Sequence, residues 1–457
     1  MERLLFALGL SVLAFVYGAA TIQFEIFPYR LLKEAKLGWQ AWASIETQKQ
    51  RFPNAFEAFE EGAAPAPQAR KLAERAGSEP VLVTGGPYQL MERCPTWGCM
   101  AWVAERSGKI LHSWEINLDE LWRGLTGVSG DVNHLSLYPV GMALGKDGSL
   151  TVSFQGRETY PVHIGIAKFD RNGAILWKRF DRSHHWIAAD EAGRVYTPYN
   201  IPYKNLKHIG DTRVDVACKT GESGVDAIRV LGPDGKPLRE LPIMEPLLRS
   251  GYRGLFYAVR DGCNLTHLNS VALVPGAVAK VLPGAAEGDL LVSLRETNAV
   301  ALLDAKTAAV KYLVSGRTAA QHGPQFLPDG TVLAFDNLGG ERRLGGTRVV
   351  RMDLVKGTSE TVFPKGAEKG LLPLHSQTAG HISVSPDGRR ALVSVTHQGR
   401  IIEIDVASGA PLWVYENTHD IARFLEASGI DSKNPRARFA TYGAYYVANL
   451  DFLKEGS

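Results

Sequence analysis

The feature that most constrains the fold of this chain is a repeated hairpin. From residue 81 onward an apolar run, a glycine-bearing turn and a second β-prone run recur. The clearest copies are MALGKDGSLTVSF (142–154), WIAADEAGRVYTPY (186–199), FLPDGTVLAFDN (326–337) and ISVSPDGRRALVSV (382–395). Their turn glycines, with one more at Gly288, give a period of about 40–50 residues. Counting weaker copies at 100–122 and 226–240, the pattern predicts an all-β chain that forms a six-bladed β-propeller with four strands per blade.

The composition is that of a globular protein. Of the 457 residues, 45% are hydrophobic and 22% are charged, which excludes a disordered, collagen-like or multi-span membrane chain. The 51 basic residues nearly balance the 48 acidic ones, so the formal net charge is +3. A charge this small offers no basic stripe for phosphate backbones, and we expect no nucleic-acid partner.

The N-terminal residues predict a membrane anchor. Leu4–Ile22 is an uncharged run of 19 residues, long enough as a helix to cross a bilayer core of about 30 Å. The alternative is a cleaved signal peptide, because the small residues Gly18–Ala20 offer a cleavage site. The anchor is favoured by interfacial aromatic residues at Phe27–Tyr29 and by an amphipathic helical pattern over Tyr29–Arg51.

The chain is expected to have three parts. Residues 1–25 are the predicted membrane anchor, residues 26–80 a helical segment and linker, and residues 81–457 the β-propeller domain. Residues 60–82 are rich in alanine, proline and charge and lack a β-pattern, so they are expected to form a linker with a short helix.

The four cysteines bear on the compartment. Cys94 and Cys99 are close in sequence, while Cys218 and Cys263 lie in loop-like stretches, so we expect one bridge within each pair. The alternative is four unrelated buried thiols. Neither pair has the Cys-x-x-Cys spacing of a zinc or redox motif. Two bridges indicate an oxidising compartment, which places the globular domain in a periplasm or outside the cell, tethered to the inner membrane by its N-terminal helix.

Four of the twelve histidines occupy equivalent positions in the repeat. His185 and His322 each precede their turn glycine by eight residues, His381 precedes its glycine by seven, and His267 opens the run before Gly288. The first strand of each propeller blade lines the central channel, so residues at its start converge at one mouth. The sequence therefore predicts a histidine cluster there, although any one of these residues alone would be an ordinary strand-end residue.

The neighbours of these histidines favour an anion site over a metal site. Asn269 follows His267, and Arg295 follows the next apolar run. The guanidinium fork of an arginine matches the oxygens of phosphate or sulfate, whereas it would repel a metal cation. We therefore expect no metal and no cofactor, while a metal site of His185, His267, His322 and His381 stays open as an alternative. Signatures of α/β-hydrolases, zincins and P-loop enzymes are absent from the sequence.

The sequence resembles the bacterial arylsulfate sulfotransferase family. The resemblance rests on HHWIAADEAG (184–193), HLNSVALV with GDLLVSLRETNAVALLD (267–304), QHGPQFLPDGTVLAFDN (321–337) and GHISVSPDG (380–388). With the opening unit that ends in GKILHSW, these stretches cover most of residues 85–415. The pairing of His-x-Asn with a later Ser-x-Arg, and of Gln-His with a later Phe-Asp-Asn, is fairly specific.

The resemblance implies a ping-pong reaction without a nucleotide, in which a sulfuryl group passes from an aryl sulfate to a histidine and then to a phenol. His322 takes the place of that nucleophile, and His185 the place of another channel histidine. His267, Asn269 and Arg295 fall where the family holds the sulfuryl oxygens. Two further histidines, His184 and His381, are also expected to contact the substrate. Leu338–Gly340 departs from the family pattern after Phe-Asp-Asn, which puts the acceptor pocket in doubt, and Tyr138, Tyr160 and Tyr199 are candidates for it.

A propeller with these features could also be a membrane-anchored binding protein without turnover, taking an anionic ligand or a protein partner. At the C-terminus, 419–430 reads as a helix, with His419 and Asp420 in its N-cap region rather than as a catalytic pair. The aromatic stretch 437–450 reads as a strand that closes the propeller by pairing with an early strand.

Overall fold

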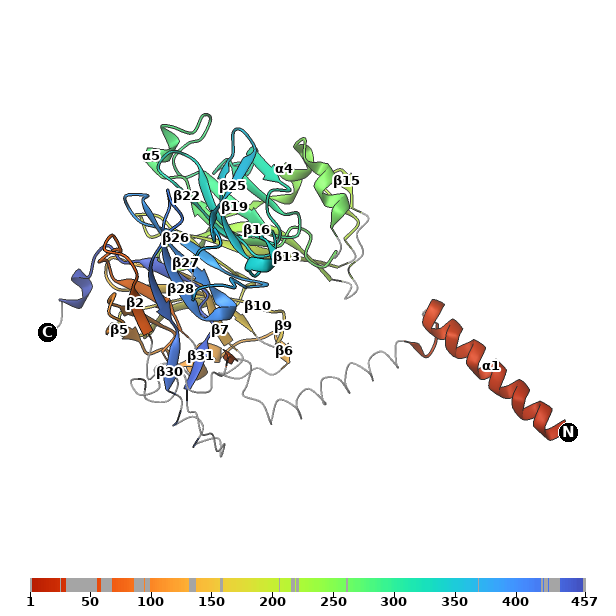
Figure 1. The fold of residues 1–457 in the computed structure, drawn as a ribbon. Helices are drawn as coiled ribbons and strands as arrows, with labels where there is room; N and C mark the ends of the chain where they lie inside the picture. The colour runs from red at the N-terminus through yellow and green to blue at the C-terminus, as the bar shows by residue number, and fades with distance from the viewer. Residues whose placement is uncertain are drawn as a thin grey trace. The chain divides into compact units, whose positions relative to one another are not determined.

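The computed structural model describes residues 2–24, 26–29, 56–58, 68–85, 94, 99–130, 137–156, 159–204, 206–214, 218, 222–259, 262–368, 370–420, 422, 426 and 436–454. The chain divides into two units, residues 1–54 and 55–457. The second unit is the six-bladed β-propeller that the repeat predicts (Figure 1).

The first unit contains the helix α1 (Glu2–Phe24). Within it, Leu5–Phe24 is a stretch of 20 residues that is long and apolar enough to cross a membrane, in agreement with the prediction. The amphipathic helix predicted over 29–51 lies, apart from Tyr29, outside the described residues.

Each blade is an antiparallel sheet whose strands neighbour one another in order. Blade 1 contains β32 (Ala444–Tyr446), β3 (Val81–Thr84), β4 (Ala101–Ala104) and β5 (Ile110–Trp114). Blade 2 contains β7 (Leu137–Leu144), β8 (Leu150–Gly156), β10 (His163–Phe169) and β11 (Ile175–Arg179). Blade 3 contains β12 (Ala188–Ala189), β13 (Val195–Lys204), β16 (Glu222–Leu231) and β17 (Pro237–Pro242).

The other three blades follow the same order. Blade 4 contains β18 (Leu268–Leu273), β19 (Leu290–Leu294), β20 (Ala299–Leu303) and β21 (Val310–Ser315). Blade 5 contains β22 (His322–Phe326), β23 (Val332–Asp336), β24 (Arg348–Asp353) and β25 (Thr358–Phe363). Blade 6 contains β26 (His381–Val384), β27 (Arg390–Val395), β28 (Arg400–Asp405), β29 (Pro411–Glu416) and a fifth strand, β2 (Gln68–Lys71).

Short elements decorate the loops. The strand pairs are β6 (Ser129–Gly130) with β9 (Thr159–Tyr160), and β14 (His208–Ile209) with β15 (Thr212–Arg213). The short helices are α3 (Leu118–Trp122), α4 (Met244–Arg249), α5 (Gly276–Ala279), η1 (Arg253–Ala258), η2 (Arg342–Leu344), η3 (Thr396–Gln398) and η4 (Asp451–Leu453).

The predicted hairpins are present, and their glycines explain the turns. Gly148 and Gly388 adopt φ angles of 78° and 71°, a left-handed conformation that glycine reaches without steric cost. Space adds a second constraint at Gly388, where a Cβ atom would lie 2.3 Å from Cδ of Pro328 in the neighbouring blade. These turns join β7 to β8 and β26 to β27, the first two strands of their blades.

The first strands of the blades neighbour one another around the ring. Strand β12 contacts β7 and β18, while β22 contacts β18 and β26, and β26 contacts β32. Between blades 3 and 4 the contact includes main-chain hydrogen bonds, since Trp186 N donates to Asn269 O and Val271 N donates to Trp186 O, both at 3.2 Å. Loops that start these strands are therefore brought together, as a histidine cluster at one mouth of the channel requires.

The ring closes through a blade made from both ends of the chain. Strand β32 pairs with β3, with Val81 opposite Tyr446 and Val83 opposite Ala444. The predicted closure by a C-terminal strand is thus confirmed. It leaves β3 paired on both sides, with β32 and with β4, rather than exposed as an open edge.

The linker prediction is wrong for residues 68–71. Strand β2 pairs antiparallel with β29, with Gln68 opposite Glu416 and Lys71 opposite Trp413. An outer strand with one free edge needs main-chain hydrogen bonds on one side only, so it can form without the alternating apolar pattern that marks an inner strand.

The helix predicted over 419–430 begins instead with a strand. Strand β30 (Thr418–Asp420) pairs with β31 (Arg436–Phe439), and β31 also pairs with β1 (Phe56–Ala58). His419 is buried, 5.2 Å from the Trp102 ring and 5.8 Å from the Phe439 ring, and it bonds Asn417 Oδ1 at 2.7 Å. Burial of this ring among aromatic side chains overrides the local helical pattern at residues 418–420. Asp420 Oδ1 accepts from Ala422 N at 2.8 Å, and Ala422 is helical, so the predicted N-cap role holds for Asp420.

One buried carboxylate ties the closing blade to its neighbours. Glu403 of β28 is fully buried and accepts hydrogen bonds from Arg106 Nη2 at 2.9 Å, Tyr446 Oη at 2.9 Å and Gly77 N at 2.8 Å. A second guanidinium, that of Arg390, lies 3.4 Å away. The carboxylate therefore joins blade 6 to both chain ends that build blade 1.

Replacing Glu403 by alanine is expected to lower the free energy of unfolding by about 3–5 kcal/mol, because it removes the fully buried anion that Arg106 and Arg390 share and leaves them only the half-buried Glu79. Urea unfolding followed by tryptophan fluorescence measures this change. The matched control is Glu360→Ala on an exposed strand position, expected to stay within about 0.5 kcal/mol of the wild type. Equal unfolding midpoints for the two variants would contradict the role given to Glu403.

Candidate active site

A cavity of about 250 Å³ lies where the loops before the first strands meet. It is lined by predicted site residues and by others from neighbouring blades. The lining residues are Tyr138, Val140, Gln155, Val162, His163, His185, Trp186, His267, Arg295, His322, Thr378, Ala379 and Tyr442. The structure therefore brings together His185, His267, His322 and Arg295 of the predicted set.

His322 begins β22, and its proton position follows from its neighbour. Asn337 Nδ2 donates to Ser376 O at 2.9 Å and to Ala379 O at 2.6 Å, so Asn337 Oδ1 is the acceptor end of that amide. His322 Nδ1 lies 2.7 Å from this oxygen and must carry the proton. The unshared electron pair is then on Nε2. Burial lowers the pKa of His322 to about 3, and the charge of Arg295 adds to this, so the ring is neutral at physiological pH.

His267 precedes β18 and is held in the opposite tautomer. Its main-chain N–H donates to Asn264 Oδ1 at 3.2 Å, which leaves Asn264 Nδ2 to donate to His267 Nδ1 at 3.1 Å. The proton of the neutral ring is therefore on Nε2. Burial in the cluster, and next the charge of Arg295, hold the pKa of His267 well below its usual value. Its backbone φ of 52° lies in the left-handed region, a strain typical of functional sites.

Arg295 follows β19 and brings the positive charge of the site. Its main-chain N–H donates to His267 O at 3.1 Å, which couples the two residues. Its Nη1 lies 2.5 Å from Glu296 Oε1, and that carboxylate is also 3.9 Å from His267 Nδ1. Glu296 offsets part of the charge of Arg295. An anion in the cavity would therefore be bound mainly by hydrogen bonds from oriented N–H groups and less by a net positive charge.

His185 precedes β12 and connects the cavity to buried polar groups. Its Nε2 lies 3.2 Å from Gln155 Nε2, and Tyr138 Oη donates to Gln155 Oε1 at 2.8 Å. Because the amide nitrogen is a donor, His185 Nε2 is the acceptor and its proton is on Nδ1. That Nδ1 lies 2.6 Å from His184 Nδ1. Burial and the neighbouring histidines hold the pKa values of His184 and His185 well below the usual value.

Three predicted substrate-binding residues do not line the cavity. His184 is buried beside His185, while Asn269 Nδ2 donates to Gln321 O at 2.9 Å next to His322. His381 is buried with its ring stacked on Trp186 at 6.1 Å and 4.6 Å from the Tyr445 ring. Direct contact of these three residues with a substrate stays a prediction. The four-histidine metal set is not assembled, because His381 lies behind Trp186.

Sequence reasoning missed His163, and the reason is its position. It begins β10, the third strand of blade 2. The predicted histidines instead share one position in the repeat, at the start of the first strand of a blade. Its ring stacks on His184 at 3.9 Å, and its Nδ1 lies 2.5 Å from Asn200 Oδ1. Within the described residues, His163, His184 and His185 form a group whose possible metal-ligand atoms all lie within 4.8 Å of one another.

An aromatic wall also escaped prediction as a unit, although Tyr138 was a candidate. The Tyr138 and Tyr442 rings lie 5.1 Å apart, and Trp186 Nε1 donates to Tyr442 O at 2.9 Å. The Trp186 ring lies edge-on to His322 at 5.4 Å. No single-sequence signal joins Tyr138, Trp186 and Tyr442, because they come from two different blades and a C-terminal loop.

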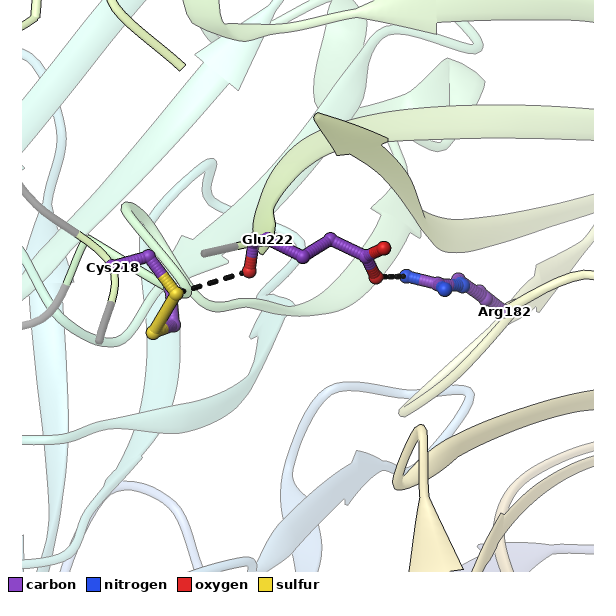
Figure 2. Close-up of a disulfide and its surroundings, with 4 residues drawn as sticks. Arg182, Cys218 and Glu222 are labelled. Atoms are coloured by element: carbon purple, nitrogen blue, oxygen red, sulfur yellow. Dashed lines mark hydrogen bonds and ion pairs between the residues drawn. A yellow bond between two sulfur atoms is a disulfide. The ribbon is translucent and has the colours of Figure 1, made fainter. Parts of the chain in front are cut away.

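Both predicted disulfides are present, Cys94–Cys99 and Cys218–Cys263. Figure 2 shows the second beside Glu222, whose side chain pairs with Arg182 Nη1 at 2.8 Å. This bridge reaches the segment before His267, and the ion pair reaches the segment before His184. The two bridges support an oxidising environment for the propeller.

Comparison with protein families decides the assignment. The family model for arylsulfotransferase (ASST) matches residues 142–418, which is more than half of the chain. The chain belongs to the arylsulfotransferase family. Membership supports aryl sulfotransferase activity in general and agrees with the resemblance drawn from the repeats. The match runs from β7 of blade 2 into β30, so it contains every histidine of the cavity.

Other comparisons are more distant. No curated protein gives a significant match. A protein of unknown function from Bacteroides caccae is 11% identical with a TM-score of 0.47, over 82% of this arylsulfotransferase and 100% of that chain. Virginiamycin B lyase from Staphylococcus aureus is 8% identical with a TM-score of 0.36, over 63% and 72% of the two chains. Likeness at this level carries no information about activity.

The buried histidines predict an acid-sensitive fold. Among the described residues, burial lowers the pKa of eight histidines, namely His112, His163, His184, His185, His267, His322, His381 and His419. Unfolded histidine binds a proton below about pH 6.5, whereas burial lowers the folded pKa to about 4 in His163 and to about 3 in His322, His381 and His419, and lowers it in the other rings as well. Protonation therefore favours the unfolded chain, and stability falls as the pH decreases through this window.

We expect the melting temperature of the arylsulfotransferase to fall steadily from pH 7.5 to pH 5, a test for differential scanning calorimetry. Each such histidine costs up to about 1.4 kcal/mol per pH unit below its unfolded pKa. Asp226 opposes the trend, because burial raises its folded pKa to about 6, but it is one group against several. A melting temperature that is constant or rises towards pH 5 would contradict the neutral state of the cluster.

Proposed function

We propose that this protein transfers a sulfuryl group from an aryl sulfate to a phenol through a sulfohistidine at His322, without a nucleotide. The observation that carries the proposal is the tautomer of His322. Asn337 holds the proton on Nδ1, so Nε2 has an unshared electron pair in a cavity that also contains Arg295. A neutral imidazole that stays unprotonated is available as a nucleophile without a separate base.

The reaction balances as two substitutions at sulfur. In the first, Nε2 of His322 bonds to sulfur while the bond between sulfur and the aryl oxygen breaks, and its electron pair leaves with the phenolate. In the second, an acceptor phenolate bonds to the same sulfur and the N–S electron pair returns to Nε2. Covalent catalysis of this kind divides a difficult transfer into two easier steps.

His267 and Arg295 are proposed to hold the sulfuryl oxygens. Both line the cavity with His322, and the proton of His267 is on Nε2, where it can be donated to an oxygen. Donors fixed in a buried site stabilise charge that develops on oxygen during transfer. Asn269 is proposed to act one step away, by holding the main chain beside His322.

The aromatic wall of Tyr138, Trp186 and Tyr442 is suited to the aryl group of donor and acceptor. These rings line the same cavity as the nucleophile, and aromatic groups pack on one another with centroids about 4.5–7 Å apart. A cavity of about 250 Å³ is below the usual range for drug-sized ligands, which favours substrates with a single ring.

We also propose that the propeller works in the periplasm or outside the cell, anchored in the inner membrane through residues 1–25. The apolar length of α1 and the two disulfides support this location. Residues 26–80 would connect the anchor to the propeller at 81–457, with β2 contributed by the connecting segment.

His322→Ala is expected to abolish transfer, because it removes the Nε2 atom proposed as the nucleophile. Intact-mass spectrometry of the wild type after 4-nitrophenyl sulfate should reveal one sulfuryl adduct that maps to His322 and disappears when phenol is added. The control, His208→Ala, changes an exposed histidine in β14 and should form the adduct normally. A folded wild type that forms no adduct with a broad panel of aryl sulfates would favour a binding propeller without turnover.

The donor half-reaction is expected to be independent of pH between pH 5 and pH 8. With its pKa lowered to about 3, His322 stays unprotonated over this range. An ordinary imidazole, with a pKa of about 6.5, would instead lose about 30-fold in kcat/KM at pH 5. Release of 4-nitrophenolate from protein shown to be folded at each pH measures the profile, and a decline centred near pH 6.5 would contradict the proposed environment of His322.

A further inference from the structure

We propose that His163, His184 and His185 bind a divalent transition-metal ion of the zinc class, at a site beside the sulfuryl-transfer residues. The site shares only His185 with the predicted catalytic set, and it does not depend on His322 or Arg295. It revises the expectation, drawn from the sequence, that the chain binds no metal. Neutral imidazole is a preferred ligand of zinc and its neighbours in the first transition row.

The distances among the three rings suit a metal with small adjustments. Zinc–nitrogen bonds of about 2.0–2.1 Å in a tetrahedral site separate two ligand nitrogens by about 3.3 Å. Here each ring offers one nitrogen, and these three nitrogens lie within 4.8 Å of one another. The separation of about 3.3 Å that zinc requires is shorter than this limit, so rotation of the rings about their side-chain bonds can bring the nitrogens to it.

A neutral imidazole has one unprotonated nitrogen, which in His185 is Nε2, facing Gln155, and in His184 is Nδ1, facing the protonated Nδ1 of His185. An ion bound by both rings would replace these two contacts. In His163 the unprotonated nitrogen is Nε2, since Nδ1 faces Asn200 Oδ1. His184 Nε2 is buried and has no hydrogen-bond partner among the described residues. The hydrogen bonding of this cluster is therefore incomplete, as expected of a site made for an additional group.

The residues behind His163 form the outer support that metal-binding histidines usually have. Asn200 Nδ2 donates to Asp226 Oδ1 at 2.6 Å, which fixes Asn200 Oδ1 towards His163 Nδ1 at 2.5 Å. Asp226 also accepts from Leu268 N at 3.0 Å and from the Thr266 hydroxyl. This chain of carboxylate, amide and imidazole fixes the tautomer and the ring orientation, as in the carboxylate–histidine–zinc arrangement.

The environment tolerates an ion and leaves one coordination position open. His163 and His185 both line the cavity, so an ion bound to them is reached from it. The positive charge of Arg295 is offset by Glu296 at 2.5 Å, which removes part of the repulsion that an unpaired guanidinium would exert on a cation. Three histidine ligands with a fourth position facing a cavity would accept water or an anion there.

The test uses the full-length chain in detergent, freed of metal with EDTA and then dialysed against micromolar free zinc. Mass spectrometry of the metal content should find about one zinc ion per chain, the stoichiometry of a single three-histidine site. His163→Gln should weaken zinc binding by more than about 100-fold, because loss of even an outer partner costs about 10–100-fold. Asn200→Ala, which removes that outer partner, should weaken binding by about 10–100-fold while the stoichiometry is kept.

Two controls locate the ion. His375→Ala changes an exposed histidine and should bind zinc as the wild type does. His322→Ala should also bind zinc normally, even though it is expected to have lost sulfuryl transfer, so failure of one proposal is separable from failure of the other. Loss of zinc in His322→Ala would place the ion among the transfer residues and overturn the proposed site.

A second measurement covers the case in which His163→Gln folds poorly. Zinc should raise the melting temperature of the wild type, because the ion binds the folded chain, and should leave that of His163→Gln unchanged. Cobalt in place of zinc should give the visible absorption of a tetrahedral nitrogen-ligated ion in the wild type only. Absence of bound zinc in the wild type, or equal binding in the wild type and His163→Gln, would overturn the proposal.

Discussion

Closure of the ring is the constraint on which the rest of this structure depends. Strand β32, from the end of the chain, pairs with β3, and Glu403 joins blade 6 to Arg106 and Tyr446 of the closing blade. Each blade contacts its neighbours, so an open ring would loosen every first strand in turn. The cavity is made from loops that precede these strands in several blades, and its geometry is therefore a property of the closed ring.

Amide side chains give chemically identical histidines different roles. Asn337 places the proton of His322 on Nδ1, whereas Asn264 places that of His267 on Nε2. One ring then offers an electron pair to the cavity, and the other offers a proton. Burial completes the arrangement, because desolvation keeps both rings neutral at physiological pH. The distinction between the proposed nucleophile and the proposed donor thus depends on amides that are not themselves reactive.

Much of the fold could be predicted from the sequence, because each repeat is a short segment with its own turn and strand pattern. Glycines at fixed intervals require left-handed turns, and alternating apolar runs around them require strands, so hairpins, blade number and the equivalence of His185, His267 and His322 follow from spacing alone. The two errors have local causes as well. Strand β2 needs only one paired edge, and His419 is held in a strand by aromatic contacts made across the fold.

The repeat, the apolar N-terminal run and the cysteine pairs are visible in the sequence, because each depends on residue type and on separation along the chain. Which side chains share the cavity depends instead on how the blades pack against one another. His163 enters it from the third strand of a blade, while His381 is withdrawn behind Trp186 although its place in the repeat matches that of His322. Contacts between blades decide which of the equivalent histidines reach the cavity. Those contacts join residues that are far apart in sequence, so no local sequence pattern predicts them.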